Sequence, residues 1–82
     1  MTVVDVGGRE LAAALRETGP DGDVIVIDED VDHLERIRKG CDAPNVSFLI
    51  GSSEVLPLPD RSVDAILGAV DEAELARVLR TP

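Results

Sequence analysis

Aromatic residues are almost absent from this sequence, and Phe48 is the only one. Bases of single-stranded nucleic acid stack on exposed aromatic rings, and protein interfaces are commonly anchored by aromatic clusters, so neither kind of surface is expected. Cations are also scarce: 8 lysines and arginines face 17 acidic residues, which gives a net charge of −9. Such a chain repels phosphate backbones and anionic lipid surfaces. We therefore expect no nucleic acid and no membrane as a partner.

Cysteine and histidine each occur once, as Cys41 and His33. A single cysteine excludes an internal disulfide and any multi-cysteine metal site, and it is typical of a cytoplasmic protein. No signal peptide is expected, and no apolar stretch approaches the ~20 residues needed to cross a bilayer. His33 falls early in a predicted helix, where we expect it to be inert, and Cys41 has no second histidine to activate it. No catalytic residue and no metal site is predicted.

The chain of 82 residues is long enough for one small domain. Runs of β-branched residues alternate with segments rich in alanine, leucine and charged residues, which is typical of alternating strands and helices. The predicted strands are Val3–Val6, Val24–Ile27, Val46–Ile50 and Val63–Leu67. The predicted helices are residues 9–18, a segment from Asp30 or Asp32 to Lys39, and Glu72–Leu79. This alternation predicts an α/β fold with a mostly parallel sheet and right-handed crossovers.

Two acidic pairs have the spacing of a capping box, in which the N-cap and third helical residues exchange hydrogen bonds. They are Asp32 with Glu35 and Asp71 with Glu74. Gly40 follows the second predicted helix and suits a left-handed position after its C-terminus.

Five segments in order resemble motifs of class I S-adenosylmethionine-dependent methyltransferases. They are Val3–Gly7, Val24–Asp28, Asn45–Gly51, Leu56–Ile66 and Ala76–Arg80. The stretch from Leu56 to Asp64 is the most telling, because it is similar to the family's Leu-Pro-Phe-Pro-Asp-Gly-Ser-Phe-Asp segment. The resemblance implies a three-layer Rossmann-like fold with a parallel sheet of about four strands in the order 3-2-1-4 and three helices. It also implies that residues 1–82 form a single truncated methyltransferase-like domain, which ends before strands five to seven.

The resemblance implies that S-adenosylmethionine lies across the carboxyl ends of the strands. It places the candidate cofactor residues in three loops: Asp5, Gly7 and Gly8 in the first, Asp28 in the second, and Ser52 in the third. Asp28 would accept hydrogen bonds from the ribose hydroxyls, and Ser52 stands where many family members have an aspartate that receives the adenine amino group. Other interpretations stay open: Gly7-Gly8 as a simple turn, Asp28 as a carboxylate before a helix, and Ser52 as a turn residue.

The first loop departs from the family pattern Asp-x-Gly-x-Gly-x-Gly. It is shorter by about two residues, and Arg9 and Glu10 add bulk where the pattern has glycine. We therefore expect S-adenosylmethionine binding to be weakened or lost. The chain is then a non-catalytic or degenerate module that associates with itself or completes a partner protein. The alternative is a minimal methyltransferase with a site assembled across a dimer, so enzymatic activity is left open.

The implied strand order leaves the fourth strand at an edge of the sheet, because no fifth strand follows it. The segment Val63–Val70 is apolar except for Asp64 near its start, and an edge of this kind exposes unpaired backbone groups to other strands. We expect a second copy of the chain to pair with it in an antiparallel, two-fold arrangement. The alternative is a monomer whose last helix folds back over this edge.

Overall fold

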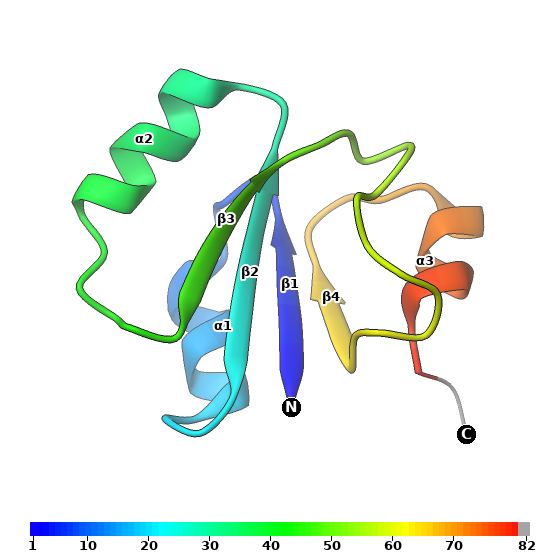
Figure 1. The fold of residues 1–82 in the computed structure, drawn as a ribbon, viewed down its shortest axis with the longest axis horizontal. Helices are drawn as coiled ribbons and strands as arrows, with labels where there is room; N and C mark the ends of the chain where they lie inside the picture. The colour runs from blue at the N-terminus through cyan, green and yellow to red at the C-terminus, as the bar shows by residue number, and fades with distance from the viewer. Residues whose placement is uncertain (81–82) are drawn as a thin grey trace.

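Four parallel strands form one sheet in a computed structural model that describes residues 1–80 (Figure 1). The strands are β1 (Thr2–Val6), β2 (Asp23–Asp28), β3 (Val46–Ile50) and β4 (Ala65–Leu67). Their order across the sheet is β3-β2-β1-β4, as the resemblance implies. Three helices, α1 (Leu11–Thr18), α2 (Val31–Lys39) and α3 (Glu72–Val78), alternate with them. Residues 81 and 82, which the single-domain prediction includes, lie outside the described residues.

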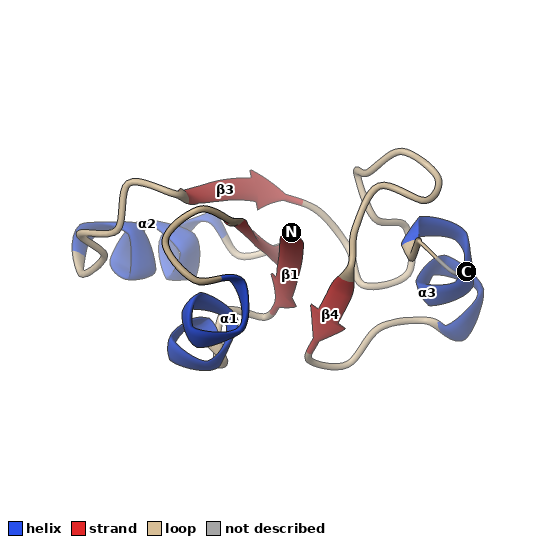
Figure 2. Cartoon of the chain, turned by 90° about the horizontal axis from the view of Figure 1, so that it is seen from below, coloured by secondary structure: helices blue, strands red, loops and turns tan. Residues whose placement is uncertain are grey.

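Both faces of the sheet are covered, which explains the uninterrupted apolar run Val24–Ile27 in β2. Helices α1 and α2 lie along one face (Figure 2). Ala14 and Leu34 from these helices pack there against Val3, Val24 and Val26. None of the three helices is long and apolar enough to span a membrane.

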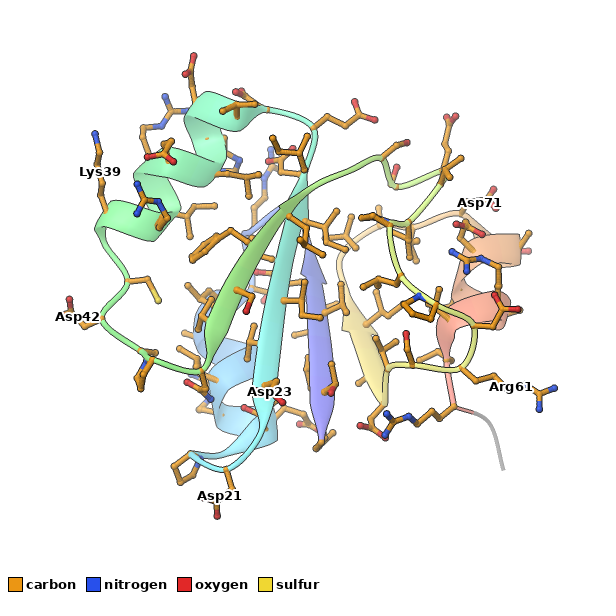
Figure 3. The ribbon with its side chains drawn as sticks, in the orientation of Figure 1. Asp21, Asp23, Lys39, Asp42, Arg61 and Asp71 are labelled. Carbon is orange, nitrogen blue, oxygen red and sulfur yellow. The ribbon has the colours of Figure 1, made fainter. Side chains whose placement is uncertain are left out.

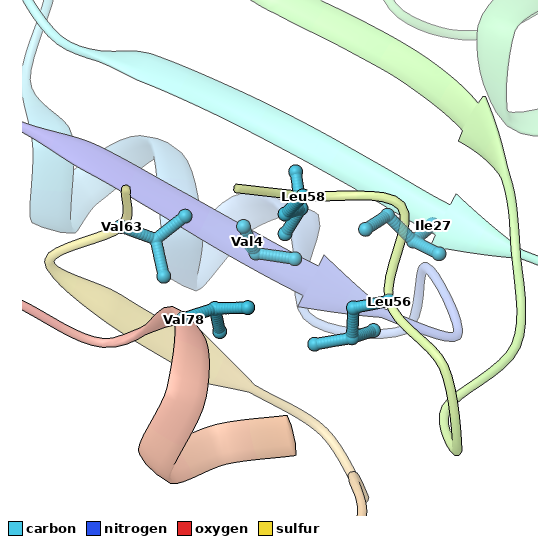
Figure 4. Close-up of a cluster of buried hydrophobic side chains, with 6 residues drawn as sticks. All are labelled: Val4, Ile27, Leu56, Leu58, Val63 and Val78. Carbon is cyan, nitrogen blue, oxygen red and sulfur yellow. The ribbon is translucent and has the colours of Figure 1, made fainter. Parts of the chain in front are cut away.

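The opposite face is covered by the segment between β3 and β4 together with α3. The buried cluster on this face consists of Val4, Ile27, Leu56, Leu58, Val63 and Val78 (Figure 4). Val3 and Val4 are adjacent in β1 and both fully buried, because successive side chains of a strand point to opposite faces. Charged side chains such as Asp21, Lys39, Asp42 and Arg61 lie on the outside (Figure 3).

The fourth strand begins at Ala65 instead of Val63, and Val63 pairs with residues 78–80 at the end of α3 and just after it. The Val63 amide donates to Val78 O at 3.0 Å, and the Arg80 amide donates to Val63 O at 2.8 Å. Val63 and Leu79 thereby form an isolated parallel bridge outside the sheet. At the other end, Gly68 adopts φ +96° and ends β4. Residues 78–80 thus lie beside the start of the predicted edge, and both alternatives for that edge stay predictions.

Some helix starts and ends differ from the prediction. Helix α1 begins at Leu11 instead of Arg9, because the loop after β1 continues through Glu10. Asp30, one of the two starts predicted for α2, is its N-cap, and the Asp30 carboxylate accepts from the amides of Asp32 and His33. The capping box of Asp32 is therefore wrong, since Asp32 lies inside the helix. Gly40 has φ −91°, so the expected left-handed conformation is also wrong.

One of the two hydrogen bonds predicted for the capping box of α3 is present. The Asp71 carboxylate accepts from the amides of Ala73 and Glu74, as an N-cap does. The reciprocal bond of a capping box is missing, because the Asp71 amide donates to Ser53 O. The Glu74 carboxylate accepts from the Leu56 amide instead, which a purely local pattern cannot reveal.

Candidate cofactor-binding site

A hollow of about 330 Å³ opens at the carboxyl ends of the strands. Its walls come from the ends of β1 and β2 and from the segments that follow β1, β2, β3 and β4. The lining residues are Val6, Gly7, Arg9, Ile27, Asp28, Glu29, Gly51, Ser53 and Ala69. In parallel sheets with helices on both faces, this end of the strands is where ligands bind.

Gly7 brings the backbone of the first loop to the wall of the hollow. It has φ +96°, a backbone conformation that residues other than glycine rarely adopt. Its amide donates to Ile27 O at 2.8 Å. A Cβ at Gly7 would meet no other atom within 4 Å, so the space beside this backbone is open. The loop can therefore approach a ligand without an intervening side chain.

The next residues of the first loop, Gly8 to Glu10, differ in whether they line the hollow. Gly8 is outside the lining, and a Cβ there would collide with the Ile37 side chain of α2. Arg9 lines the hollow, whereas Glu10 does not. Of the two bulky residues in this loop, only Arg9 thus faces the candidate site.

Asp5 lies in β1 and is fully buried, but it is not part of the wall. Its Oδ2 accepts from the Glu10 amide at 3.2 Å, which ties the end of the first loop to the strand. Its Oδ1 is buried and has no hydrogen-bond partner among residues 1–80. Burial raises the pKa of this carboxyl, and the backbone hydrogen bond from Glu10 opposes the rise. In this position Asp5 holds the first loop against β1. Direct contact of Asp5 with a cofactor stays a prediction.

Asp28 ends β2 and lies on the wall of the hollow with 22% of its side chain exposed. Its Oδ2 lies 2.5 Å from Nδ1 of His33, and its Oδ1 accepts from the Asp30 amide at 3.3 Å. The hydrogen bond from His33 is the main reason that the pKa of Asp28 is lowered. The carboxylate is therefore held in its charged form, as an acceptor for hydroxyl groups requires.

The loop after β3 places two neighbouring serines differently. Ser52 is not part of the wall, and its hydroxyl accepts from the Glu54 amide at 3.0 Å in a local turn. Ser53 lines the hollow, and its carbonyl oxygen accepts from the Asp71 amide at 3.0 Å. A cofactor contact by Ser52 stays a prediction, while Ser53 is a lining residue that the sequence motifs did not single out.

The charges around the hollow are mixed. The lining residues include one basic residue, Arg9, and two acidic residues, Asp28 and Glu29. No three histidine, cysteine or acidic side chains within residues 1–80 gather into a group that could hold a metal ion. The wall therefore has the donors and acceptors for an organic ligand that carries hydroxyl groups and an anionic group.

A parallel sheet of this order, with helices between its strands and a hollow at its carboxyl ends, defines a Rossmann-like α/β domain. A family model described as "Methyltransferase domain" matches residues 3–81. The chain belongs to the class I S-adenosylmethionine-dependent methyltransferase family, in agreement with the resemblance found in the sequence.

Relatives of known structure have the same architecture. A S-adenosylmethionine-dependent methyltransferase from Aquifex aeolicus is 32% identical, with a TM-score of 0.77 over 98% of this chain and 51% of its own. A chain in the complex between the Haloferax volcanii Trm112 methyltransferase activator and a methyltransferase is 34% identical, with a TM-score of 0.67 over 79% of this chain and 30% of its own.

A curated relative, the arsenite methyltransferase of Halobacterium salinarum, is 36% identical over 72 residues. That match covers 80% of this chain and 18% of the relative. The chain thus spans about a fifth of this curated relative and about a third to a half of the two solved structures.

Proposed function

We propose that this chain binds S-adenosylmethionine in the hollow at the carboxyl ends of its strands. One observation carries the proposal: Asp28, held as a charged carboxylate, faces the same open space as the exposed backbone of Gly7. A vicinal diol needs an acceptor of this kind, and a closely approaching ligand needs bare backbone. The shortened loop supports an affinity weaker than that of an intact family loop.

The residues of the wall fit the parts of such a cofactor. Asp28 would accept hydrogen bonds from the ribose hydroxyls, and Arg9 would pair with the carboxylate of the methionine part. Ser53 offers a hydroxyl for a polar edge of the base. When bound, the cofactor supplies an activated methyl group on a sulfonium; this chain's residues bind and orient the molecule.

We further propose that the chain acts as a cofactor-binding module whose methyl acceptor and acceptor-side groups come from another polypeptide. A related methyltransferase occurs in a complex with an activator protein, which supports a protein partner. The alternative, a minimal methyltransferase with a site assembled across a dimer, needs the same cofactor contacts. A cytoplasmic location stays a prediction.

Self-association through β4 also stays a proposal. Residues 78–80 lie beside Ser62 and Val63. The edge of the sheet that a second copy can pair with therefore consists of β4, Ala65–Leu67, and the residues that follow this strand. Sedimentation at micromolar concentration tests the idea: a dimer that Ile66→Lys dissociates supports pairing at this strand, whereas a monomeric wild-type chain contradicts it.

Calorimetric titration with S-adenosylhomocysteine tests cofactor binding. Ala69→Leu fills the hollow and should weaken binding, and Ala76→Leu, an exposed position on α3, serves as the matched control. Ligand at ~100 times its dissociation constant should stabilise the fold by about 2.7 kcal/mol. No heat and no thermal shift at millimolar ligand would contradict the proposed function.

A further inference from the structure

His33 is the one histidine of the chain, and it contacts the candidate site through another residue. Its Nδ1 lies 2.5 Å from Oδ2 of Asp28, while His33 itself is absent from the wall of the hollow. About a third of its side chain, 30%, is exposed. His33 is therefore placed to act on a ligand only through the Asp28 carboxylate.

The start of α2 explains why these two side chains meet. Strand β2 ends at Asp28, and two residues later Asp30 caps the helix. Oδ1 of Asp30 accepts from the His33 amide at 3.2 Å, which fixes the backbone of His33 in the first turn. The imidazole is thereby held over the end of the strand, five residues along the chain from its partner.

The surroundings of Asp28 show what the contact does. Asp28 is partly exposed, so its side chain is not fixed by packing alone. The backbone amide of Asp30 holds Oδ1 only by a long contact of 3.3 Å. The hydrogen bond from His33 therefore keeps the carboxylate in place through Oδ2.

We propose that His33 is a positioning residue that holds the Asp28 carboxylate for the vicinal hydroxyl groups of a nucleoside ligand. This inference rests on the proposed function. Oδ2 is occupied by the imidazole, so Oδ1 is the oxygen that a ribose hydroxyl would reach. A long contact of 3.3 Å to the Asp30 amide leaves that oxygen weakly engaged.

Two substitutions at position 33 separate positioning from bulk. His33→Ala removes the donor, whereas the side-chain amide of His33→Asn can donate from nearly the place of Nδ1. Arg38→Ala is the matched control, because it breaks the exposed Glu35–Arg38 pair on the same helix away from the hollow. The probes are S-adenosylhomocysteine, adenosine and 2′-deoxyadenosine, measured by calorimetry with the intact chain.

His33→Ala should weaken S-adenosylhomocysteine binding by about tenfold and reduce the preference for adenosine over 2′-deoxyadenosine. His33→Asn should recover most of both, and Arg38→Ala should change neither. Asp28→Asn combined with His33→Ala should be little worse than Asp28→Asn alone, because the histidine acts through the aspartate. If His33→Ala binds and discriminates like the wild-type chain, the positioning role is wrong and the cofactor site stands.

A second readout needs no ligand. The Asp28 carboxyl carbon, followed by NMR titration, should show a pKa that returns toward its ordinary value in His33→Ala and stays low in Arg38→Ala. An unchanged Asp28 titration in His33→Ala overturns the inference. Failure of the wild-type chain to bind any of the three probes overturns the proposed function and, with it, the role assigned to His33, even if the NMR shift is found.

Discussion

The Glu74 carboxylate and the Arg77 guanidinium, one turn apart on α3, form a two-bond ion pair. Nε of Arg77 lies 2.7 Å from Oε2 of Glu74, and Nη2 lies 2.9 Å from Oε1. Both partners also bind the segment that follows β3. Glu74 accepts from the Leu56 amide, and Arg77 donates to the carbonyl oxygens of Leu56 and Leu58. The pair therefore fastens two buried leucines of the core to α3.

Arg77→Ala should lower the melting temperature, because two carbonyl oxygens lose their donor and the Leu56–Leu58 segment loosens. Arg38→Ala is the control, since Arg38 pairs with Glu35 at the same spacing on an exposed face. Thermal unfolding should show a clearly larger decrease for Arg77→Ala. Equal decreases would mean that the contacts to the leucine carbonyls contribute nothing beyond a surface ion pair.

Acid should remove the contribution of Glu74. Its hydrogen bond to Arg77 and the bond from Leu56 lower its pKa from 4.5 to about 2. Because the pKa of Glu74 is lower in the folded chain than in the unfolded chain, the charged carboxylate stabilises the fold at pH values above the unfolded-state pKa. That stabilisation is lost as the pH falls toward about 2. Urea unfolding between pH 6 and pH 2 should show a smaller loss in Glu74→Gln than in the wild-type chain across this window. Parallel profiles of the two proteins contradict the assignment.

The contribution of Asp5 to stability should change with pH in the opposite direction to that of Glu74. Burial raises its pKa, so its contribution to stability is fully present below the ordinary value of 3.8 and is lost as the pH rises through the folded-state value. Between pH 3 and pH 7, the wild-type chain should lose stability relative to Asp5→Asn, in which no charge forms. A constant difference in unfolding free energy over that range would show that the buried carboxyl does not titrate differently in the folded state.

Arg9 should decide whether a ligand with a carboxylate is preferred. Arg9→Ala should weaken S-adenosylhomocysteine binding about tenfold, the effect of one charge-assisted contact, and leave 5′-methylthioadenosine, which lacks the amino-acid part, unchanged. Arg16→Ala on the exposed face of α1 is the control. Calorimetry distinguishes this from a general loss of the site, in which both ligands would weaken together.

Val78→Ala should create a cavity in the cluster formed with Val4 and Ile27. We expect a loss of about 2 kcal/mol and, for a chain of this size, a decrease in melting temperature of about 8–16 °C. Val55→Ala removes the same atoms from a side chain that is 71% exposed, and it should be nearly neutral. Similar losses for both variants would contradict the packing seen around Val78.

Most of the fold could be predicted because its signals are local. The β-branched runs, the N-cap of Asp71 and the basic residues at the end of α2 depend on neighbours a few residues away. Two differences involve distant groups: Val63 bonds to Val78 and Arg80, and the Asp71 amide bonds to Ser53 instead of Glu74. The error at Asp32 is local, because Asp30, two residues earlier, is the N-cap of α2.

The residues of the candidate site could also be predicted only in part. Gly7 and Asp28 could be placed from their position at the ends of strands, and both lie on the wall of the hollow. Ser52 and Ser53 could not be told apart, because the direction of a turn decides which of the two residues lines the hollow. The sequence did not predict that His33 contacts Asp28, and the expectation that His33 is not catalytic stays a prediction.

The sequence by itself determined the alternation of strands and helices, the family and the loops in which a ligand would lie, because periodicity, capping residues and motif order are properties of short segments. Only the tertiary structure decided which side chains meet: His33 with Asp28, and Arg77 with the carbonyls of Leu56 and Leu58. Such contacts depend on angles between packed elements, and a small rotation of a helix or loop changes which polar atoms lie within hydrogen-bond distance.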